Sequence, residues 1–313
     1  MARLLVTGAS GLLGANLALG ACKQHAVMGV YHSHPLSSTE FAVWCADLSQ
    51  PTAVRELMGE FEPEWVVHCA AETRVEVSEH DPGSAFLRNR DMARAVAEAS
   101  YAAGAKLIHI STDAVFDGVQ GGYAEQDPPS PLTVYGRSKL EGEQAVLKAH
   151  PEACVVRTNL FGWNALPKSS LAEWFLDHLE QGRPCNGFID VFANLIFVND
   201  LSLILLRILE LGLGGLYHVA ARDCLSKYRF GVLLAKEFGL DPGLIQPTSV
   251  DTMQFHATRS KKLCLSTRKI TQALGSAPPS IAEGLRHFRE TRENGYSARV
   301  KMLVQGEKAH ERN

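Results

Sequence analysis

The feature that most constrains the fold of this chain is a glycine-rich turn close to its N-terminus, VTGASGLLG at residues 6–14. The apolar residues before the turn predict a buried strand, and those after it predict a helix. Gly8 permits the sharp turn, Gly11 lets the backbone approach a pyrophosphate, and Gly14 lets the helix pack against the strand. The N–H groups and partial positive charge at a helix N-terminus favour phosphate. The turn therefore predicts a dinucleotide-binding fold. Its G-x-x-G-x-x-G spacing leaves a plain helix start as the alternative.

Length and charge exclude several classes of protein. The chain has 313 residues, of which 46% are hydrophobic, and this is enough for a large core with a smaller lobe. The 31 basic and 34 acidic residues give a net charge of −3 without a basic stripe, so we expect no nucleic-acid partner. The chain opens directly on a strand, and its apolar runs are short. We therefore expect a cytoplasmic protein without a membrane partner.

The seven cysteines are scattered along the chain and include no C-x-x-C pair. Such a pattern predicts reduced thiols rather than a disulfide framework or a zinc site, and we expect no bound metal. Cys69 and Cys154 lie in apolar runs, where a buried small side chain is the ordinary role.

Strand-like and helical segments alternate through the first half of the chain. The strand-like runs are residues 4–6, 26–31, 41–45, 65–71, 106–111 and 154–157, and the helical segments are 15–19, 52–61, 84–103 and 135–148. This alternation predicts a Rossmann-like α/β fold with a doubly wound parallel sheet. The near-continuous apolar strands fit a sheet that helices cover on both faces.

The alternation loosens after residue 160, where neither a repeat nor a second glycine-rich nucleotide turn occurs. We expect a smaller, mixed α/β C-terminal lobe that binds substrate, with Ser226 capping a helix over 227–238. The expected domains are a nucleotide-binding domain over 1–160 to which 186–218 return, a substrate lobe over 161–185 and 219–288, and a polar tail over 289–313. The tail lacks an apolar face and should be dispensable for folding.

A second motif, YGRSK at residues 135–139, supplies candidate catalytic residues. Residues four apart on a helix share a face, so Tyr135 and Lys139 should point the same way. A nearby ammonium lowers the pKa of a phenol, which would let Tyr135 exchange a proton with an alcohol or ketone. The alternative is a solvated Tyr/Lys pair.

A third motif, ISTD at residues 110–113, lies where the strand over 106–111 ends. Ligands of open α/β sheets bind at the carboxyl ends of the strands. Thr112 can therefore hydrogen-bond the substrate oxygen that Tyr135 protonates. The ordinary alternatives are a turn hydroxyl for Thr112 and a loop carboxylate for Asp113.

In this order, the three motifs resemble the extended short-chain dehydrogenase/reductase superfamily from Leu4 to about Phe288. The marks of the resemblance are TGASGLLG at 7–14, Asp47–Leu48, HCAA at 68–71, Asn89, STDAVFDG at 111–118 and YGRSKLEGE at 135–143. Together with RTNLFG at 157–162, they are similar to the dTDP-4-dehydrorhamnose reductase branch. The regulatory β subunit of methionine adenosyltransferase is also similar, at VVHCAAETR (66–74) and LSKYRFG (225–231).

The resemblance implies an NAD(P)H-dependent reductase of a 4-keto-6-deoxy nucleotide sugar. It implies that Tyr135 protonates the carbonyl oxygen, Lys139 holds the nicotinamide ribose and Thr112 orients the carbonyl. The implied cofactor contacts are Gly8, Ser10, Gly11, Leu12, Leu13, Gly14, Tyr31, Ser33, Asp47, Leu48, Cys69, Ala70, Ala71, Tyr135 and Lys139. The implied substrate contacts are Asp113, Phe116, Asn159 and Arg259.

Two positions depart from the reductase branch, because Ala114 stands where tyrosine is usual and Leu160 where tryptophan is usual. Two other functions therefore stay open: a cofactor-binding regulatory subunit without turnover, and a nucleotide-sugar epimerase. A dehydratase would carry a second acid directly after Thr112 and Asp113, where this chain has Ala114. The expected partner is a nucleotide sugar, and a homodimer stays open.

The segment after the second strand predicts the cofactor. A site that prefers NAD places an acid roughly 20 residues past the glycine turn. That position falls at Tyr31 to His34, and the first acidic residue of the chain is Glu40. We therefore expect NADP(H) to be preferred, with Ser33 donating to the 2′-phosphate. No arginine stands there to hold the phosphate, so the preference should be modest and NAD stays possible.

Overall fold

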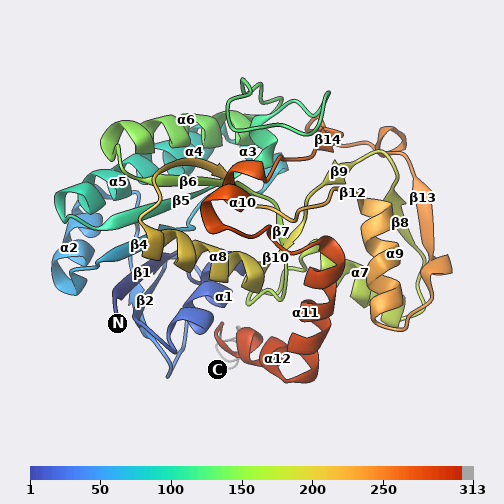
Figure 1. The fold of residues 1–313 in the computed structure, drawn as a ribbon, viewed down its shortest axis with the longest axis horizontal. Coiled ribbons are helices and arrows are strands. Elements are labelled where there is room, and N and C mark those ends of the chain that lie inside the picture. Colours follow the sequence, from blue (N-terminus) through green and yellow to red (C-terminus); the bar gives the residue numbers. More distant parts are fainter. Residues whose placement is uncertain (305–313) are drawn as a thin grey trace, which may run out of the picture.

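The protein is represented by a computed structural model that describes residues 1–304. Its centre is a parallel sheet of seven strands in the order β11-β6-β5-β4-β1-β2-β3 (Figure 1). The strands are β1 (Arg3–Thr7), β2 (Ala26–Tyr31), β3 (Ala42–Cys45), β4 (Trp65–His68), β5 (Lys106–Thr112), β6 (Cys154–Thr158) and β11 (Gly215–His218). The predicted doubly wound sheet is confirmed, with β11 added to its edge beside β6.

Helices cover both faces of the sheet. One layer holds α2 (Pro51–Phe61), α5 (Met92–Ala102) and α6 (Val134–Ala149), and the other holds α1 (Leu12–Ala21) and α8 (Val198–Leu211). Successive residues of β1 enter different cores, since Leu4 and Val6 pack under α1 and α8, whereas Leu5 packs under α2 and α5. Successive side chains point to opposite faces because the strand is pleated. A strand that is buried on both faces therefore has a continuous run of apolar residues in its sequence.

The long helix expected over 84–103 is interrupted. It consists of α4 (Pro82–Phe86), a π-helical turn over Leu87–Asp91, and α5, and a short helix α3 (Val75–His80) precedes it. The π turn holds Asn89, whose buried amide accepts from the Glu72 N–H at 2.9 Å and donates to the Ser138 hydroxyl at 2.9 Å. The wider turn thus ties the loop after β4 to α6, which is typical of π turns near functional sites.

The second half of the chain adds three small sheets. They pair β10 (Ile196–Phe197) with β7 (Leu160–Phe161), β12 (Leu225–Ser226) and β14 (Lys262–Leu263) with β9 (Phe192–Ala193), and β13 (Ile245–Thr248) with β8 (Cys185–Phe188). The helices of this half include α7 (Leu171–Glu180), α9 (Lys227–Glu237) and α10 (Arg268–Leu274), with 3₁₀ turns at Pro242–Leu244 and Val250–Thr252. Another 3₁₀ turn, Asp113–Val115, directly follows β5 in the first half. The Ser226 side chain accepts from the Arg229 N–H, which confirms the predicted cap of α9.

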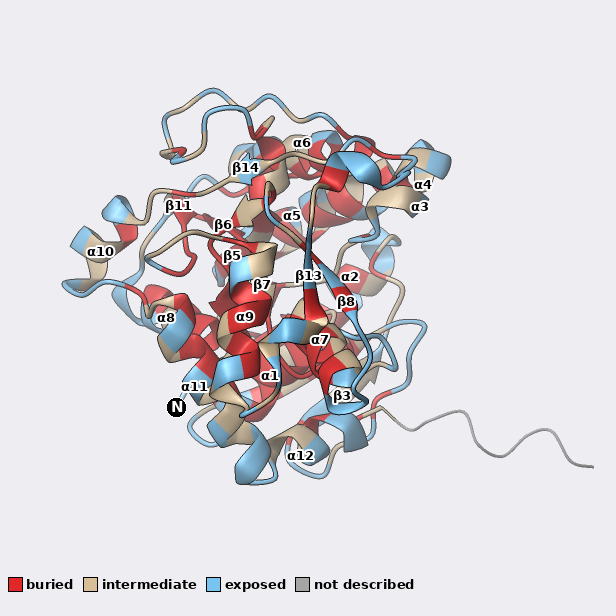
Figure 2. Ribbon diagram, turned by 90° about the vertical axis from the view of Figure 1, so that its right-hand side faces the viewer, coloured by how far each residue is buried: buried red, intermediate tan, exposed pale blue. Residues whose placement is uncertain are grey.

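Residues 289–304 are not the polar tail that the sequence predicts. They complete α11 (Ile281–Glu293) and form α12 (Tyr296–Met302), which packs beside α1. Figure 2 shows that most of α12 is intermediate or exposed. Tyr296, Val300 and Leu303 are spaced i, i+4, i+7 and make a short apolar stripe, and Val300 and Leu303 are buried. Residues 305–313 of the predicted tail lie outside the described residues.

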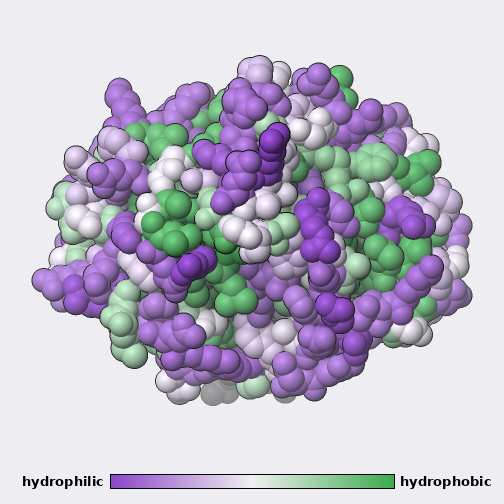
Figure 3. All heavy atoms as spheres, in the orientation of Figure 1, coloured by the Kyte–Doolittle hydropathy of each residue, from purple (hydrophilic) through white to green (hydrophobic). Residues whose placement is uncertain are grey.

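The face of the molecule drawn in Figure 3 is mostly polar. Figure 3 shows hydrophilic side chains over most of one face, with apolar residues scattered between them. In the part of the chain that the structure describes, none of the helices combines the length and apolar character needed to cross a membrane.

Candidate active site

A cavity of about 1170 Å³ runs along the carboxyl ends of the parallel strands. It brings together residues that are far apart in the sequence and that the sequence analysis singles out. Those that line it are Gly8, Ser10, Gly11, Leu12, Leu13, Gly14, Tyr31, Ser33, Asp47, Leu48, Cys69, Ala70, Ala71, Thr112, Asp113, Tyr135, Lys139, Asn159 and Arg259. The expected substrate contact Phe116 does not line the cavity, because its ring is fully buried and stacks on Tyr123 with centroids 4.2 Å apart.

The glycine turn has the geometry of a phosphate cradle. Gly8 has a φ of +65°, and a Cβ there would lie 2.7 Å from the Ala70 backbone nitrogen. At Gly14, a Cβ would lie 2.3 Å from the Gly8 carbonyl oxygen, so both positions require glycine. The N-cap of α1 is Gly11, which has no side chain to bond the first-turn N–H groups. Those donors stay available to an anion, so the residues fit the pyrophosphate of a dinucleotide.

The end of β2 forms the far wall of the cavity. His32, Ser33 and His34 line it, and the Ser33 hydroxyl lies 3.2 Å from Nδ1 of His34. Across from them, the Asp47 carboxylate accepts hydrogen bonds from the Ser49 hydroxyl at 2.7 Å and the Ser49 N–H at 3.0 Å. The hydrogen bond from the Ser49 hydroxyl lowers the pKa of Asp47. The Asp47 carboxylate therefore stabilises the turn from Asp47 to Ser49 by accepting both hydrogen bonds.

The first turn of α6 places Tyr135 beside the end of β5. Thr133 caps this turn by accepting from the Gly136 N–H, and a Cβ on Gly136 would lie 2.3 Å from the Ala114 carbonyl oxygen. Glycine here therefore lets α6 approach the strand end that holds Thr112. The Thr112 hydroxyl also accepts from the Ala114 N–H at 3.1 Å, so the ordinary turn role of this threonine is present as well.

The electrostatics of the Tyr/Lys pair differ from the prediction. Burial raises the pKa of Tyr135 to about 12, and the Thr112 hydroxyl offsets part of the rise by hydrogen bonding. Lys139 turns instead toward the sheet, where its ammonium donates to the Ile110 carbonyl at 2.7 Å. Burial also lowers the pKa of Lys139 to about 8. The expected lowering of the Tyr135 pKa by Lys139 is therefore absent. The Lys139 ammonium is bound by the Ile110 carbonyl, and burial of the phenol dominates its pKa.

A buried ion pair fixes α6 against the sheet one turn beyond Lys139. Arg157 of β6 binds the Glu143 carboxylate through two hydrogen bonds of 2.9 and 2.7 Å. The Ser111 hydroxyl donates to the same carboxylate at 2.5 Å. Because both charges are buried and paired, removal of either partner would leave an uncompensated charge. The ion pair thus fixes the position of α6 relative to β5, and therefore also the position of Tyr135.

Charged groups also line the substrate side of the cavity. Asp113 is buried and accepts a 2.7 Å hydrogen bond from Asn159. Lys227 faces Asp113 from the first turn of α9, and burial lowers the pKa of this lysine. Arg259 lies over the Phe255 ring at 4.5 Å and pairs with Glu76 at 2.5 Å. The lining of the site therefore combines a buried acid with two cationic side chains.

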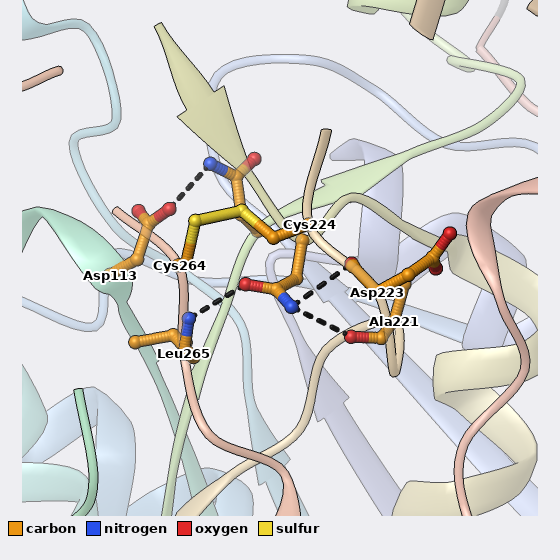
Figure 4. Close-up of a disulfide and its surroundings, with 8 residues drawn as sticks. Asp113, Ala221, Asp223, Cys224, Cys264 and Leu265 are labelled. Carbon is orange, nitrogen blue, oxygen red and sulfur yellow. Dashed lines mark hydrogen bonds between the residues drawn. A yellow bond between two sulfur atoms is a disulfide. The ribbon is translucent and has the colours of Figure 1, made fainter. Parts of the chain in front are cut away.

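The prediction that all cysteines are reduced is wrong for one pair. Cys224 and Cys264 form a disulfide with an S–S distance of 2.03 Å, whereas the other five cysteines are free. Figure 4 shows the bond with Asp113 in the same close-up. In parallel, the Asn194 side chain donates to the Ala221 and Asp223 carbonyls and accepts from the Leu265 N–H. The disulfide and the hydrogen bonds of Asn194 both join the segment before α9 to the segment that follows β14.

Glu72 and Lys227 are among the residues of the cavity wall that were not predicted from the sequence. Glu72 is buried, lines the cavity and pairs with Arg74 at 2.8 Å. It follows the buried strand β4 at the same edge as Thr112, and an acid placed there was a signal that could have been used. Lys227 directly follows Ser226, so the predicted cap already placed this lysine at the start of a helix.

Comparisons with known proteins agree with this geometry. The model of the RmlD substrate binding domain family matches residues 2–293. A dTDP-4-dehydrorhamnose reductase of Mycobacterium tuberculosis is 34% identical, over 92% of this chain and 90% of that protein. The methionine adenosyltransferase 2 subunit beta of Pongo abelii is 31% identical, over 88% and 84% respectively. The crystal structure of a dTDP-4-dehydrorhamnose reductase from Bacillus anthracis in complex with NADP has a TM-score of 0.80 at 28% identity, covering 92% of this chain and 99% of that one.

Proposed function

The chain belongs to the RmlD substrate binding domain family of extended short-chain dehydrogenases/reductases, and from that membership we propose that it reduces the keto group of a nucleotide sugar with NADPH. The observation that carries the proposal is the convergence of Thr112, Tyr135 and Lys139 on one cavity with the glycine turn. A binding protein needs the turn alone. A reductase needs a proton donor beside it.

The three side chains divide the work. Bound NADPH supplies the hydride. Tyr135 keeps its proton at neutral pH, as a phenol ordinarily does, and its place in the cavity lets it donate that proton to a carbonyl oxygen. Thr112 holds the same oxygen by a hydrogen bond. Lys139 lines the same cavity, and its ammonium, which donates to the Ile110 carbonyl, is the group that would hold the nicotinamide ribose.

NADP(H) is the cofactor of the reductase from Bacillus anthracis, and the wall at the end of β2 supports the same choice here. None of the residues from Tyr31 to His34 is acidic, so a 2′-phosphate meets no carboxylate in that segment. Ser33 is its donor, and the neighbouring His34 adds positive charge when it is protonated.

The substrate is a 4-keto-6-deoxy nucleotide sugar. Lys227 and Arg259 suit its diphosphate, whereas Asp113 and Asn159 suit sugar hydroxyls. Ala114 and Leu160 replace the larger side chains expected in the reductase branch, which leaves more room on the sugar side. The sugar accepted by this chain should therefore be bulkier than the rhamnose precursor.

The regulatory subunit is the second candidate, since the similarity to the methionine adenosyltransferase subunit covers most of the chain. Oxidation of NADPH with a keto sugar distinguishes the two functions, because only the reductase would carry it out. A nucleotide-sugar epimerase would differ from a reductase because it would leave no net oxidised cofactor, and from a regulatory subunit because it would convert its sugar. A homodimer and a cytoplasmic location stay predictions. The Cys224–Cys264 disulfide argues against a cytoplasmic location, because structural disulfides are rare in a reducing compartment.

The test is a thermal-shift screen over nucleotide sugars with NADPH present. A ligand that binds the folded state raises the melting temperature. The proposal predicts a shift with 4-keto nucleotide sugars, followed by loss of NADPH absorbance on longer incubation. A shift with NADPH and no oxidation with any keto sugar would favour the regulatory function.

A further inference from the structure

The end of the chain contacts the loop that follows β2. The Ser37 N–H donates to the Leu303 carbonyl at 2.8 Å, and Leu36 pairs with Val304 as an antiparallel bridge. The Arg299 guanidinium of α12 forms an ion pair with Glu40 of the same loop. Three kinds of interaction thus join one short loop to residues more than 250 positions later.

Burial strengthens this contact. Leu36 and Leu303 are 6% and 4% exposed, and both belong to the core cluster beneath α1. Phe41, at the other end of the loop, packs against Gly29 of β2, where a Cβ would lie 2.8 Å from its ring. The loop over 36–41 is therefore held at both ends. The C-terminal segment packs on the end at Leu36, and β2 packs on the end at Phe41.

The same loop begins with the residues that face the cofactor. His32, Ser33 and His34 line the cavity, and Pro35 alone separates them from Leu36. Proline fixes its own φ and restricts the residue before it. Leu36 and His34 are therefore joined through one residue whose backbone has little freedom.

We propose that α12 with Leu303 and Val304 is a positioning element that sets the selectivity of this protein for NADP(H) over NAD(H). It holds Ser33 and His34 where they receive the 2′-phosphate, although none of its own residues lines the cavity. This inference rests on the proposed placement of the phosphate at Ser33.

The first test compares two core substitutions in the full chain. Leu303→Ala removes packing beneath the loop, whereas Leu285→Ala removes a similarly buried side chain from α11, away from the loop. Kd is measured for NADPH and NADH by fluorescence titration at fixed ionic strength, with melting temperatures alongside. Leu303→Ala should weaken NADPH binding at least threefold and leave NADH within twofold. Leu285→Ala should lower only the melting temperature. An unchanged NADPH:NADH ratio in Leu303→Ala, or an equal change in both variants, overturns the proposal.

The second test uses the ion pair, because positioning and simple charge predict opposite signs. Loss of the Glu40 carboxylate by Glu40→Gln would tighten NADPH binding if only its charge mattered. If the pair positions the loop, Glu40→Gln and Arg299→Gln both weaken NADPH binding, by about twofold to fivefold, which is the range that an exposed pair can give. Tighter NADPH binding in Glu40→Gln contradicts positioning.

Ser33→Ala separates this inference from the one on which it rests. If Ser33→Ala abolishes the NADPH preference while Leu303→Ala and Glu40→Gln keep it, the phosphate lies at Ser33 and the role of α12 is refuted. If Ser33→Ala keeps the preference, the placement of the phosphate is itself wrong, and the role of α12 falls with it.

Discussion

The Asn159 side chain donates a 2.7 Å hydrogen bond to the Asp113 carboxylate at the floor of the cavity. Despite this bond, burial raises the pKa of Asp113 to about 6. The ordinary value of an aspartate is 3.8, so the folded protein holds the Asp113 proton more tightly than the unfolded chain does. The stability that this proton contributes is complete below the unfolded pKa and is lost as pH rises through about 6.

Asp113→Asn should therefore stabilise the protein at pH 8, because the amide keeps a carbonyl acceptor for Asn159 and carries no charge. The expected gain is about 1–3 kcal/mol at pH 8 and becomes smaller toward pH 5. Urea unfolding of the two proteins at both pH values measures it. An equal difference at the two pH values would show that burial of the charge is not the cause.

Cys224→Ser and Cys264→Ser should each destabilise the protein by about 2–4 kcal/mol, since the bond closes a long loop in the unfolded chain. A reductant should lower the melting temperature of the parent and leave that of either variant unchanged. Cys45→Ser is the control, because this cysteine is exposed and free. A parent that is insensitive to reductant would show that the two thiols are not joined in solution.

Truncation after Phe288 should lower the melting temperature or leave the protein insoluble. It removes Val300 and Leu303, and burial of such side chains contributes about 1.5–3 kcal/mol each. A chain that ends at Val304 is the matched control, since it keeps every described contact of α12. Identical melting of the two truncated chains would restore the view that residues 289–304 are dispensable.

The sequence was sufficient where one residue type meets a local requirement. The glycines of the turn, the Ser226 cap and the alternation of strands and helices each follow from short-range rules, and the structure confirms them. These rules also bring Thr112 and Tyr135 to one edge, because parallel strands end there together.

What could not be predicted depends on contacts between distant segments. The Cys224–Cys264 bond joins positions 40 residues apart, and a count of cysteines does not reveal which two meet. The stripe of α12 has only three apolar members, too few to stand out in a charged segment. The pKa of Tyr135 depends on burial and on the turn of Lys139 toward the Ile110 carbonyl, and helical spacing shows neither.

The central claim is that Tyr135 protonates a keto sugar reduced by NADPH, and steady-state oxidation of NADPH tests it most directly. With a 4-keto nucleotide sugar that raises the melting temperature, the parent should consume NADPH in proportion to the sugar. Tyr135→Phe should lose at least a hundredfold in kcat, the range of general acid catalysis, and bind NADPH with unchanged Kd. Turnover by Tyr135→Phe at more than a few per cent of the parent rate would contradict the assigned role, and a parent that binds NADPH without oxidising it would contradict the proposed reductase.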